Sequence, residues 1–158
     1  MIFVGECRSL TARRRGWTWR DGRLAAKPLF EALGAMGVNP ELHDFMNLWT
    51  DDSVTPVVPW QRVALLRTRR AEGVVIVALG QRVSAELARR EIDHVALVHP
   101  AARGRIRKRA RYVAHVRERL SPHVASAHHK MTHQTAPEST RTTRTTTRAK
   151  STQERKTK

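Results

Sequence analysis

Cysteine is almost absent from this 158-residue chain, in which Cys7 is the only one. A single cysteine excludes an internal disulfide framework, and it also excludes a cysteine-ligated iron–sulfur cluster or zinc knuckle. A reduced, cytoplasmic setting fits this composition. Chemistry that depends on cysteine-bound metal is therefore not expected.

Long hydrophobic runs are also missing. No apolar stretch approaches the roughly 20 residues that a membrane-spanning helix needs. Residues 1–4 are too short for a signal peptide and lead directly into Gly5-Glu6, as a buried strand would. We expect no membrane segment and a location in the cytoplasm of a bacterium or of a phage-infected host cell.

Acidic residues are scarce: 14 Asp and Glu stand against 30 Lys and Arg, for a formal net charge of +16. Unpaired cations are rarely buried, so the excess must lie on the surface, where it attracts polyanions. Nucleic acid is the first candidate partner and an anionic membrane the second. The alternative is a chain that is basic for solubility or through genomic bias, since Arg outnumbers Lys in the first 120 residues.

Nucleotide-binding signatures are lacking as well. The chain has neither a Gly-x-Gly-x-x-Gly pattern nor a phosphate-loop motif, so the usual dinucleotide and nucleoside triphosphate modes have no support. A doubly wound domain that acts on free nucleotides or nucleosides in another way is a further alternative.

Composition changes near Ser121-Pro122. Residues 121–158 carry eight Lys and Arg against Glu138 and Glu154 and have almost nothing to bury, which predicts a disordered basic tail after a domain of residues 1–120. Such a tail can hold DNA nonspecifically or can be a loose extension without a role. Its histidines have no carboxylate or cysteine partners and indicate no metal site: His123, His128, His129 and His133.

Apolar periodicity alternates between strand and helix within residues 1–120. Strands are predicted at 2–5, 44–49, 74–79 and 94–98, and helices at 24–36, 60–72, 81–90 and 106–120. In the helix 60–72 the inward positions are Val63, Leu65 and Leu66, and the outward ones are Arg62, Arg67, Arg69 and Arg70. This alternation predicts an α/β fold, a doubly wound three-layer sandwich with a central four-stranded parallel sheet.

Ligands of such sheets bind beyond the carboxyl ends of the strands. The residues that follow the predicted strands are Gly5-Glu6-Cys7, residues 47–50, Gly80-Gln81 and His99-Pro100. We expect several of them to meet at one edge of the sheet.

In their order along the chain these segments resemble the uracil-DNA glycosylase superfamily, in the branches whose first motif starts Gly-Glu. The resemblance covers about 120 residues and implies a DNA glycosylase that hydrolyses the N-glycosidic bond of uracil or another damaged base flipped out of DNA. It implies no metal and no organic cofactor. The matching segments are Val4-Gly5-Glu6, Gly16-Trp17-Thr18-Trp19, Gly22-Arg23-Leu24, Phe45-Met46-Asn47, Ala78-Leu79-Gly80 and Val98-His99-Pro100.

Three features depart from the family pattern. Cys7-Arg8-Ser9 replaces a small residue followed by Pro-Gly, Ala101-Ala102 replaces Ser-Pro, and the cluster cysteines of some branches are absent. The alternative hypothesis is a noncatalytic basic nucleic-acid-binding protein that keeps the glycosylase fold.

Glycosidic bond cleavage needs a carboxylate and a group that stabilises the departing base. Glu6 is the predicted carboxylate, because the first strand delivers it to the sheet edge; the alternative is that it bonds loop amides or pairs with residues 13–15. His99 is predicted to bond the base oxygen, and the alternative is a histidine that caps the strand end.

A flipped base also needs a stacking partner and a polar group that recognises its edge. Trp19, or Trp17, is predicted to stack on the base, with core packing as the alternative. Asn47 is predicted to bind the base edge, with strand-end capping as the alternative. Trp49 and Trp60 are assigned to the core or an interface.

Basic residues follow His99-Pro100 directly: seven of the nine residues 103–111 are Arg, Lys or Gly, with no acid. Gly104 gives the loop freedom, and a helix start at Ile106 would offer amides to a phosphate. A solvated charged face is the alternative. The partner is predicted to be single- or double-stranded DNA and the protein a monomer. The predicted backbone contacts are Arg103, Arg105, Arg107, Lys108, Arg13 and Arg14.

Overall fold

A computed structural model describes residues 1–51 and 54–132, with side chains up to residue 124. Four parallel strands form one sheet in the order β2-β1-β3-β4, which confirms the predicted four-stranded parallel sheet. The elements are β1 (Ile2–Gly5), α1 (Leu10–Arg15), η1 (Trp19–Asp21), α2 (Ala26–Gly34), η2 (Pro40–Leu42), β2 (Asp44–Asn47), α3 (Trp60–Ala71), β3 (Ile76–Leu79), α4 (Gln81–Arg89), β4 (Val95–Leu97), η3 (Arg105–Arg107) and α5 (Arg109–Thr132).

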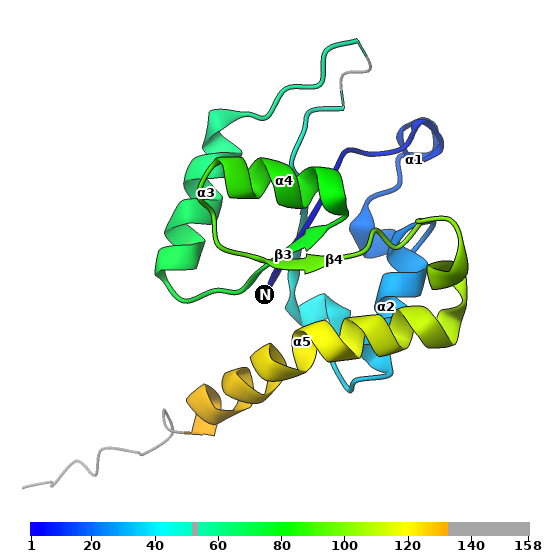
Figure 1. The fold of residues 1–158 in the computed structure, drawn as a ribbon. Coiled ribbons are helices and arrows are strands. Elements are labelled where there is room, and N and C mark those ends of the chain that lie inside the picture. The colour runs from blue at the N-terminus through cyan, green and yellow to red at the C-terminus, as the bar shows by residue number, and fades with distance from the viewer. Residues whose placement is uncertain (52–53, 133–158) are drawn as a thin grey trace, which may run out of the picture.

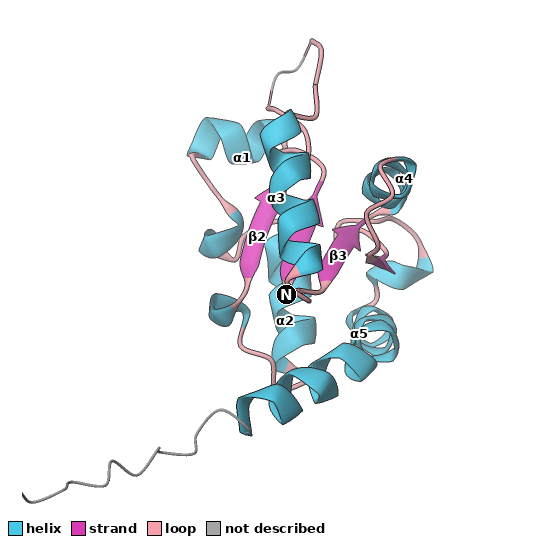
Figure 2. Cartoon of the chain, turned by 90° about the vertical axis from the view of Figure 1, so that its left-hand side faces the viewer, coloured by secondary structure: helices cyan, strands magenta, loops and turns pink. Residues whose placement is uncertain are grey.

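Helices cover both faces of the sheet (Figures 1 and 2). Because side chains alternate along a strand, Val4 of β1 points toward α3 and α4, where it packs with Val63, Leu66 and Leu87. Phe3 points the opposite way, toward α2 and α5. The three layers are therefore α3/α4, the sheet, and α2/α5.

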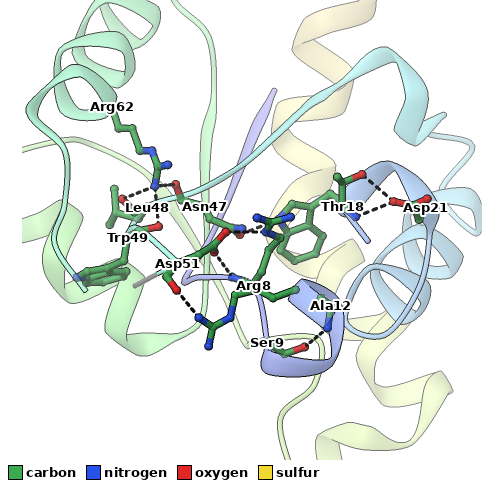
Figure 3. A network of polar contacts seen from close by, with 12 residues as sticks. Arg8, Ser9, Ala12, Thr18, Asp21, Asn47, Leu48, Trp49, Asp51 and Arg62 are labelled. Atoms are coloured by element: carbon green, nitrogen blue, oxygen red, sulfur yellow. Dashed lines mark hydrogen bonds and ion pairs between the residues drawn. The ribbon is translucent and has the colours of Figure 1, made fainter. Parts of the chain in front are cut away.

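Two assignments in α3 are wrong. Leu65 is 46% exposed, whereas Val63 and Leu66 are buried. Arg62 turns inward, and its Nη1 donates hydrogen bonds to the carbonyls of Asn47, Leu48 and Trp49 (Figure 3). The carbonyls at the end of β2 need donors, and a long guanidinium side chain can supply them.

The last helix begins later and runs further than predicted. It starts at Arg109 instead of residue 106, and it continues through Pro122 to Thr132. Val116 and Leu120 are buried, and Val124 packs against the same cluster one turn further on. This apolar row holds the helix against the sheet although Pro122 cannot donate a backbone hydrogen bond. Of the predicted disordered tail, residues 121–132 are therefore helical, and residues 133–158 lie outside the described residues.

Candidate nucleobase and phosphate site

A cavity of about 300 Å³, here called the tryptophan cavity, lies at the carboxyl ends of β1, β2 and β4. Its volume lies at the lower end of the roughly 300–1,000 Å³ typical of small-molecule sites. The lining residues come from the segments that follow β1 and β4, from the last residue of β2 and from the start of α2 with the loop before it. Those used below are Arg8, Trp17, Trp19, Leu24, Asn47 and His99.

Trp19 is fixed against the end of β1. Its Nε1 donates a hydrogen bond of 2.9 Å to Asn47 Oδ1, and its ring stacks on Phe45 with centroids 5.9 Å apart. A Cβ on Gly5 would lie 2.5 Å from the ring atom Cζ2 of Trp19. The first-motif glycine is thus required here by the close approach of an indole.

Asn47 has two roles in the tryptophan cavity. Its Oδ1 is bound to the indole of Trp19, so this atom anchors the wall of the cavity. Within the described residues its Nδ2 group has no acceptor and stays available as a donor. The amide can therefore offer a ligand its two N–H donors. Its oxygen, the acceptor that the sequence also led us to expect, is already used by Trp19.

Trp17 forms another part of the lining. Its backbone N–H is bonded to the carbonyl of Ala12 in α1, and Arg23 places its guanidinium carbon 5.8 Å from the ring centroid. Trp17 therefore presents a half-buried aromatic surface next to a cation.

His99 enters the cavity with a defined tautomer. Its Nδ1 accepts a 3.1 Å hydrogen bond from the N–H of Ala101, so the proton of the neutral ring lies on Nε2. Burial lowers the pKa of His99, while the charge of Glu6 acts in the opposite direction and is outweighed. At neutral pH the ring is uncharged and its Nε2–H, which has no acceptor in the described part of the chain, is a hydrogen-bond donor.

Glu6 does not line the tryptophan cavity. Its carboxylate forms an ion pair with Arg82 of α4, and Arg82 lies 4.9 Å from the ring centroid of Trp49. Trp49 is buried in the core on this side, as predicted, whereas Trp60 is 72% exposed. The partner of Glu6 is 76 residues away in the sequence, and no local pattern indicates it.

Arg13, predicted to contact DNA, instead faces the protein. It donates from Nη1 to the carbonyl of Asp51, and its buried Nε has no partner in the described chain. Arg8 also binds Asp51, through its backbone N–H at 3.0 Å and its Nε at 2.6 Å (Figure 3). Burial acts to raise the pKa of Asp51, but the bonds from Arg8 and the charges of Arg8 and Arg13 outweigh it and lower that pKa. Arg14 is exposed.

A second cavity, of about 710 Å³, adjoins the first and is here called the arginine cavity. It lies between α2 and the segment that joins β4 to α5, and Leu24 and Ala101 line both cavities. Arg103 and Arg107 line it, whereas Arg105 and Lys108 are exposed outside it. The other lining residues used below are Lys27, Pro28, Glu31, Ile106 and Arg109.

Most cations around the arginine cavity have no acidic partner. Arg109 pairs with Glu31 at 3.2 Å; within residues 1–51 and 54–132, the salt bridges include none from Arg103, Arg105, Arg107 or Lys108. The expected helix start at Ile106 is wrong, because residues 105–107 form a single 3-10 turn before α5. The positive charge here is thus carried by side chains rather than by a helix end.

Neither cavity offers an evident metal site. Within the described residues no group of three or more His, Cys, Asp and Glu is placed to hold a metal ion. In the same part of the chain no helix has the length and apolarity to cross a membrane. A comparison with protein families, curated proteins and solved structures found no match for this chain.

Three candidate functional residues were not among the site residues predicted from the sequence: Arg82, Leu24 and Lys27. Arg82 was hidden because its partner Glu6 is remote in sequence. Leu24 was predicted to be the first residue of a helix, but it precedes α2, is 49% exposed and has a backbone φ of +50°. Lys27 carried no signal beyond its charge.

Proposed function

We propose that the protein binds nucleic acid and holds one unpaired or flipped-out nucleobase in the tryptophan cavity. The observation that carries this proposal is the convergence of Trp17, Trp19, Asn47 and His99 on one cavity. Aromatic faces stack on any base, and the free N–H donors of Asn47 and His99 match the carbonyl oxygens and ring nitrogens of a base edge.

The unpaired cations beside the cavity support a polymeric partner over a free base. Arg103 and Arg107 line the adjoining cavity, and Arg105 and Lys108 lie exposed next to it. Phosphate contacts position a nucleic acid without selecting its sequence, so this surface would hold the backbone while the tryptophan cavity holds a base.

The test compares two single strands of twelve nucleotides in fluorescence anisotropy, one with bases and one made of abasic sugars. Base–aromatic stacking is worth about 1–3 kcal/mol, so we expect the base-containing strand to bind about tenfold tighter. Trp17→Ala and His99→Gln should remove most of this difference.

Trp60→Ala is the matched control, because Trp60 is exposed at the start of α3. It should leave the preference for bases unchanged. Equal binding of the two strands by the wild-type protein would refute the proposed function.

A second candidate function is hydrolysis of the N-glycosidic bond of the bound base, as the resemblance to the uracil-DNA glycosylase superfamily implies. The neutral His99 ring with its proton on Nε2 favours it, because such a donor can bond a base oxygen on which negative charge develops. Glu6 would supply the carboxylate once it leaves Arg82, since its charge already acts on His99.

Release of uracil, or of a deaminated purine, from a single-lesion oligonucleotide tests the second candidate. Glu6→Gln and His99→Gln should each abolish base release. Glu6→Gln should change the affinity for the strand by less than about threefold. If folded wild-type protein releases no base, catalysis is excluded and the binding function stands alone.

A further inference from the structure

The two cavities are neighbours and share a boundary at Leu24 and Ala101, here called the ridge. Leu24 and Ala101 contribute to the lining of both. Figure 1 shows how this comes about: the segment before α2 and the segment after β4 lie side by side at the same end of the molecule. A ligand that fills the tryptophan cavity can therefore continue over the ridge into the arginine cavity.

The chemistry of the arginine cavity suits a nucleotide. Lys27, Arg103 and Arg107 supply positive charge without an ion pair in the described chain, and the acid Glu31 is already occupied by Arg109. Pro28 and Ile106 add apolar surface to the same lining. Cations for a phosphodiester thus stand beside an apolar wall that a flat base can cover.

The ridge itself is strained. Leu24 has a φ of +50°, a left-handed conformation that costs an L-residue without a compensating side-chain bond roughly 1–2 kcal/mol. A hydrogen bond of 2.9 Å from the N–H of Ala26 to the carbonyl of Arg23 closes the turn around it. The turn leaves the leucine side chain about half exposed between the cavities. Strain at an exposed apolar residue between two cavities points to a role in binding.

We propose that the two cavities hold two consecutive nucleotides of a single strand, with Leu24 between the bases. The phosphodiester between them lies against Lys27, Arg103 and Arg107. This inference rests on the proposed function and adds the substrate class to it. In a duplex two adjacent bases would have to unpair and unstack together, a cost that a single strand does not carry.

The first test measures affinity by calorimetry for five probes: thymidine monophosphate, the dinucleotide TpT, the trinucleotide TpTpT, a twelve-nucleotide single strand, and the same strand paired with its complement. We expect a rise of at least tenfold from one nucleotide to two, a rise below about threefold from two to three, and at least tenfold weaker binding of the duplex than of the single strand.

Leu24→Gly is the most selective variant, because glycine adopts a φ of +50° without strain. The melting temperature should stay the same or rise, while the gain in affinity from one nucleotide to two is lost. Arg107→Ala should reduce binding of the dinucleotide more than that of the monophosphate. Arg111→Ala removes the same charge from an exposed site outside both cavities and should change neither by more than about twofold.

The outcomes separate this inference from the function beneath it. If the duplex binds as tightly as the single strand, or if one and two nucleotides bind equally while Trp17→Ala still weakens both, the two-nucleotide site is overturned and base binding stands. If Trp17→Ala weakens no probe, the proposed function fails as well.

Discussion

The two helical layers of this protein are both rich in arginine, but they use it differently. On the α3/α4 layer, here called the paired face, Arg69, Arg70, Arg82, Arg89 and Arg90 each form an ion pair with a carboxylate. On the segment that leads into α5, here called the open face, Arg103, Arg105, Arg107 and Lys108 have no such partner within the described residues.

The difference shows that net charge alone is a poor guide to a binding surface. A carboxylate beside an arginine already neutralises it, whereas an unpaired cation can neutralise a phosphate and so release counterions that are condensed on the nucleic acid. The open face also adjoins two cavities, and the paired face adjoins neither of them. We therefore expect polyanions to bind at the open face.

Neutralising the open face is expected to have the largest effect. A quadruple variant combines Arg103→Gln, Arg105→Gln, Arg107→Gln and Lys108→Gln. Affinity for a single strand should fall about 10²-fold near 0.1 M salt in this variant. Its dependence on the logarithm of salt concentration should become shallower by about 0.7 for each phosphate that the variant no longer binds. Anisotropy titrations at three salt concentrations measure both.

The matched control neutralises Arg69, Arg70, Arg89 and Arg90 on the paired face in the same way. Both variants lose four charges, so any effect of net charge is equal between them. We expect the control to lose less than about threefold in affinity. Equal losses in the two variants would show that location does not matter and would remove the distinction between the faces.

Gly5→Ala is the next largest expected effect, because it attacks the wall of the tryptophan cavity. The new Cβ would lie 2.5 Å from Trp19 Cζ2 and 3.0 Å from Asn47 Oδ1. Overpacking of this kind costs about 1–3 kcal/mol of unfolding free energy, which urea denaturation measures. Binding of a base-containing strand should weaken in parallel.

Gly34→Ala is the control for that change. Gly34 ends α2 and is exposed, and outside its two chain neighbours and the backbone of its own helix no atom lies within 4 Å of the position that an alanine Cβ would take there. Alanine at this position should be neutral or should stabilise by up to about 0.5–1 kcal/mol. A Gly5→Ala variant as stable as Gly34→Ala would contradict the close approach of Trp19.

The pH dependence of stability is expected to be smaller. Burial lowers the pKa of His99 below its ordinary value of 6.5, so the unfolded chain binds the proton more readily than the folded one. The contribution of the uncharged His99 ring to the free energy of unfolding is complete above about pH 6.5. It is lost as the pH falls from that value through the pKa of His99 in the folded protein. Urea denaturation between pH 7.5 and 5 should therefore show a decline.

His99→Gln should flatten part of this decline. His43, His115 and the Met1 amino group contribute to the remainder, because their pKa values are also lowered, first of all by burial. An unchanged pH profile in His99→Gln would mean that the ring is not held neutral in the folded protein.

The smallest expected effect is that of breaking one exposed pair on the paired face. Arg69 and Glu72 bond at 3.0 Å, and both side chains are about half exposed. Exposed pairs contribute about 0–1 kcal/mol, so Arg69→Gln should lower the unfolding free energy by about 0.5 kcal/mol or less, with strand affinity unchanged. A loss above about 1 kcal/mol would give this pair a structural role.

Much of the fold follows from local pattern. The continuous apolar run before Gly80 can be satisfied only as a strand covered on both faces, and it becomes β3. Glycines mark the ends of elements because they adopt positive φ, as Gly80 does. The alternation of such runs with amphipathic helices then leaves little choice but a parallel sheet.

Contacts between remote segments could not be predicted in this way. Arg62 turns inward because the carbonyls after β2 lie within its reach, and Glu6 turns toward Arg82 rather than into the cavity. Arg13 binds Asp51 for the same reason. Each depends on which long side chain reaches which unsatisfied group in three dimensions. The sequence places residues at the sheet edge, and the packing decides which way they point.

Ultraviolet cross-linking to a single strand that carries one 4-thiouridine tests base binding at the two cavities most directly, since mass spectrometry locates the adducts. We predict adducts on residues 7–25 and 99–107, around the two cavities, and their loss in the presence of excess unmodified strand. Adducts confined to α3 and α4, or to residues 133–158 alone, would contradict binding at this edge of the sheet.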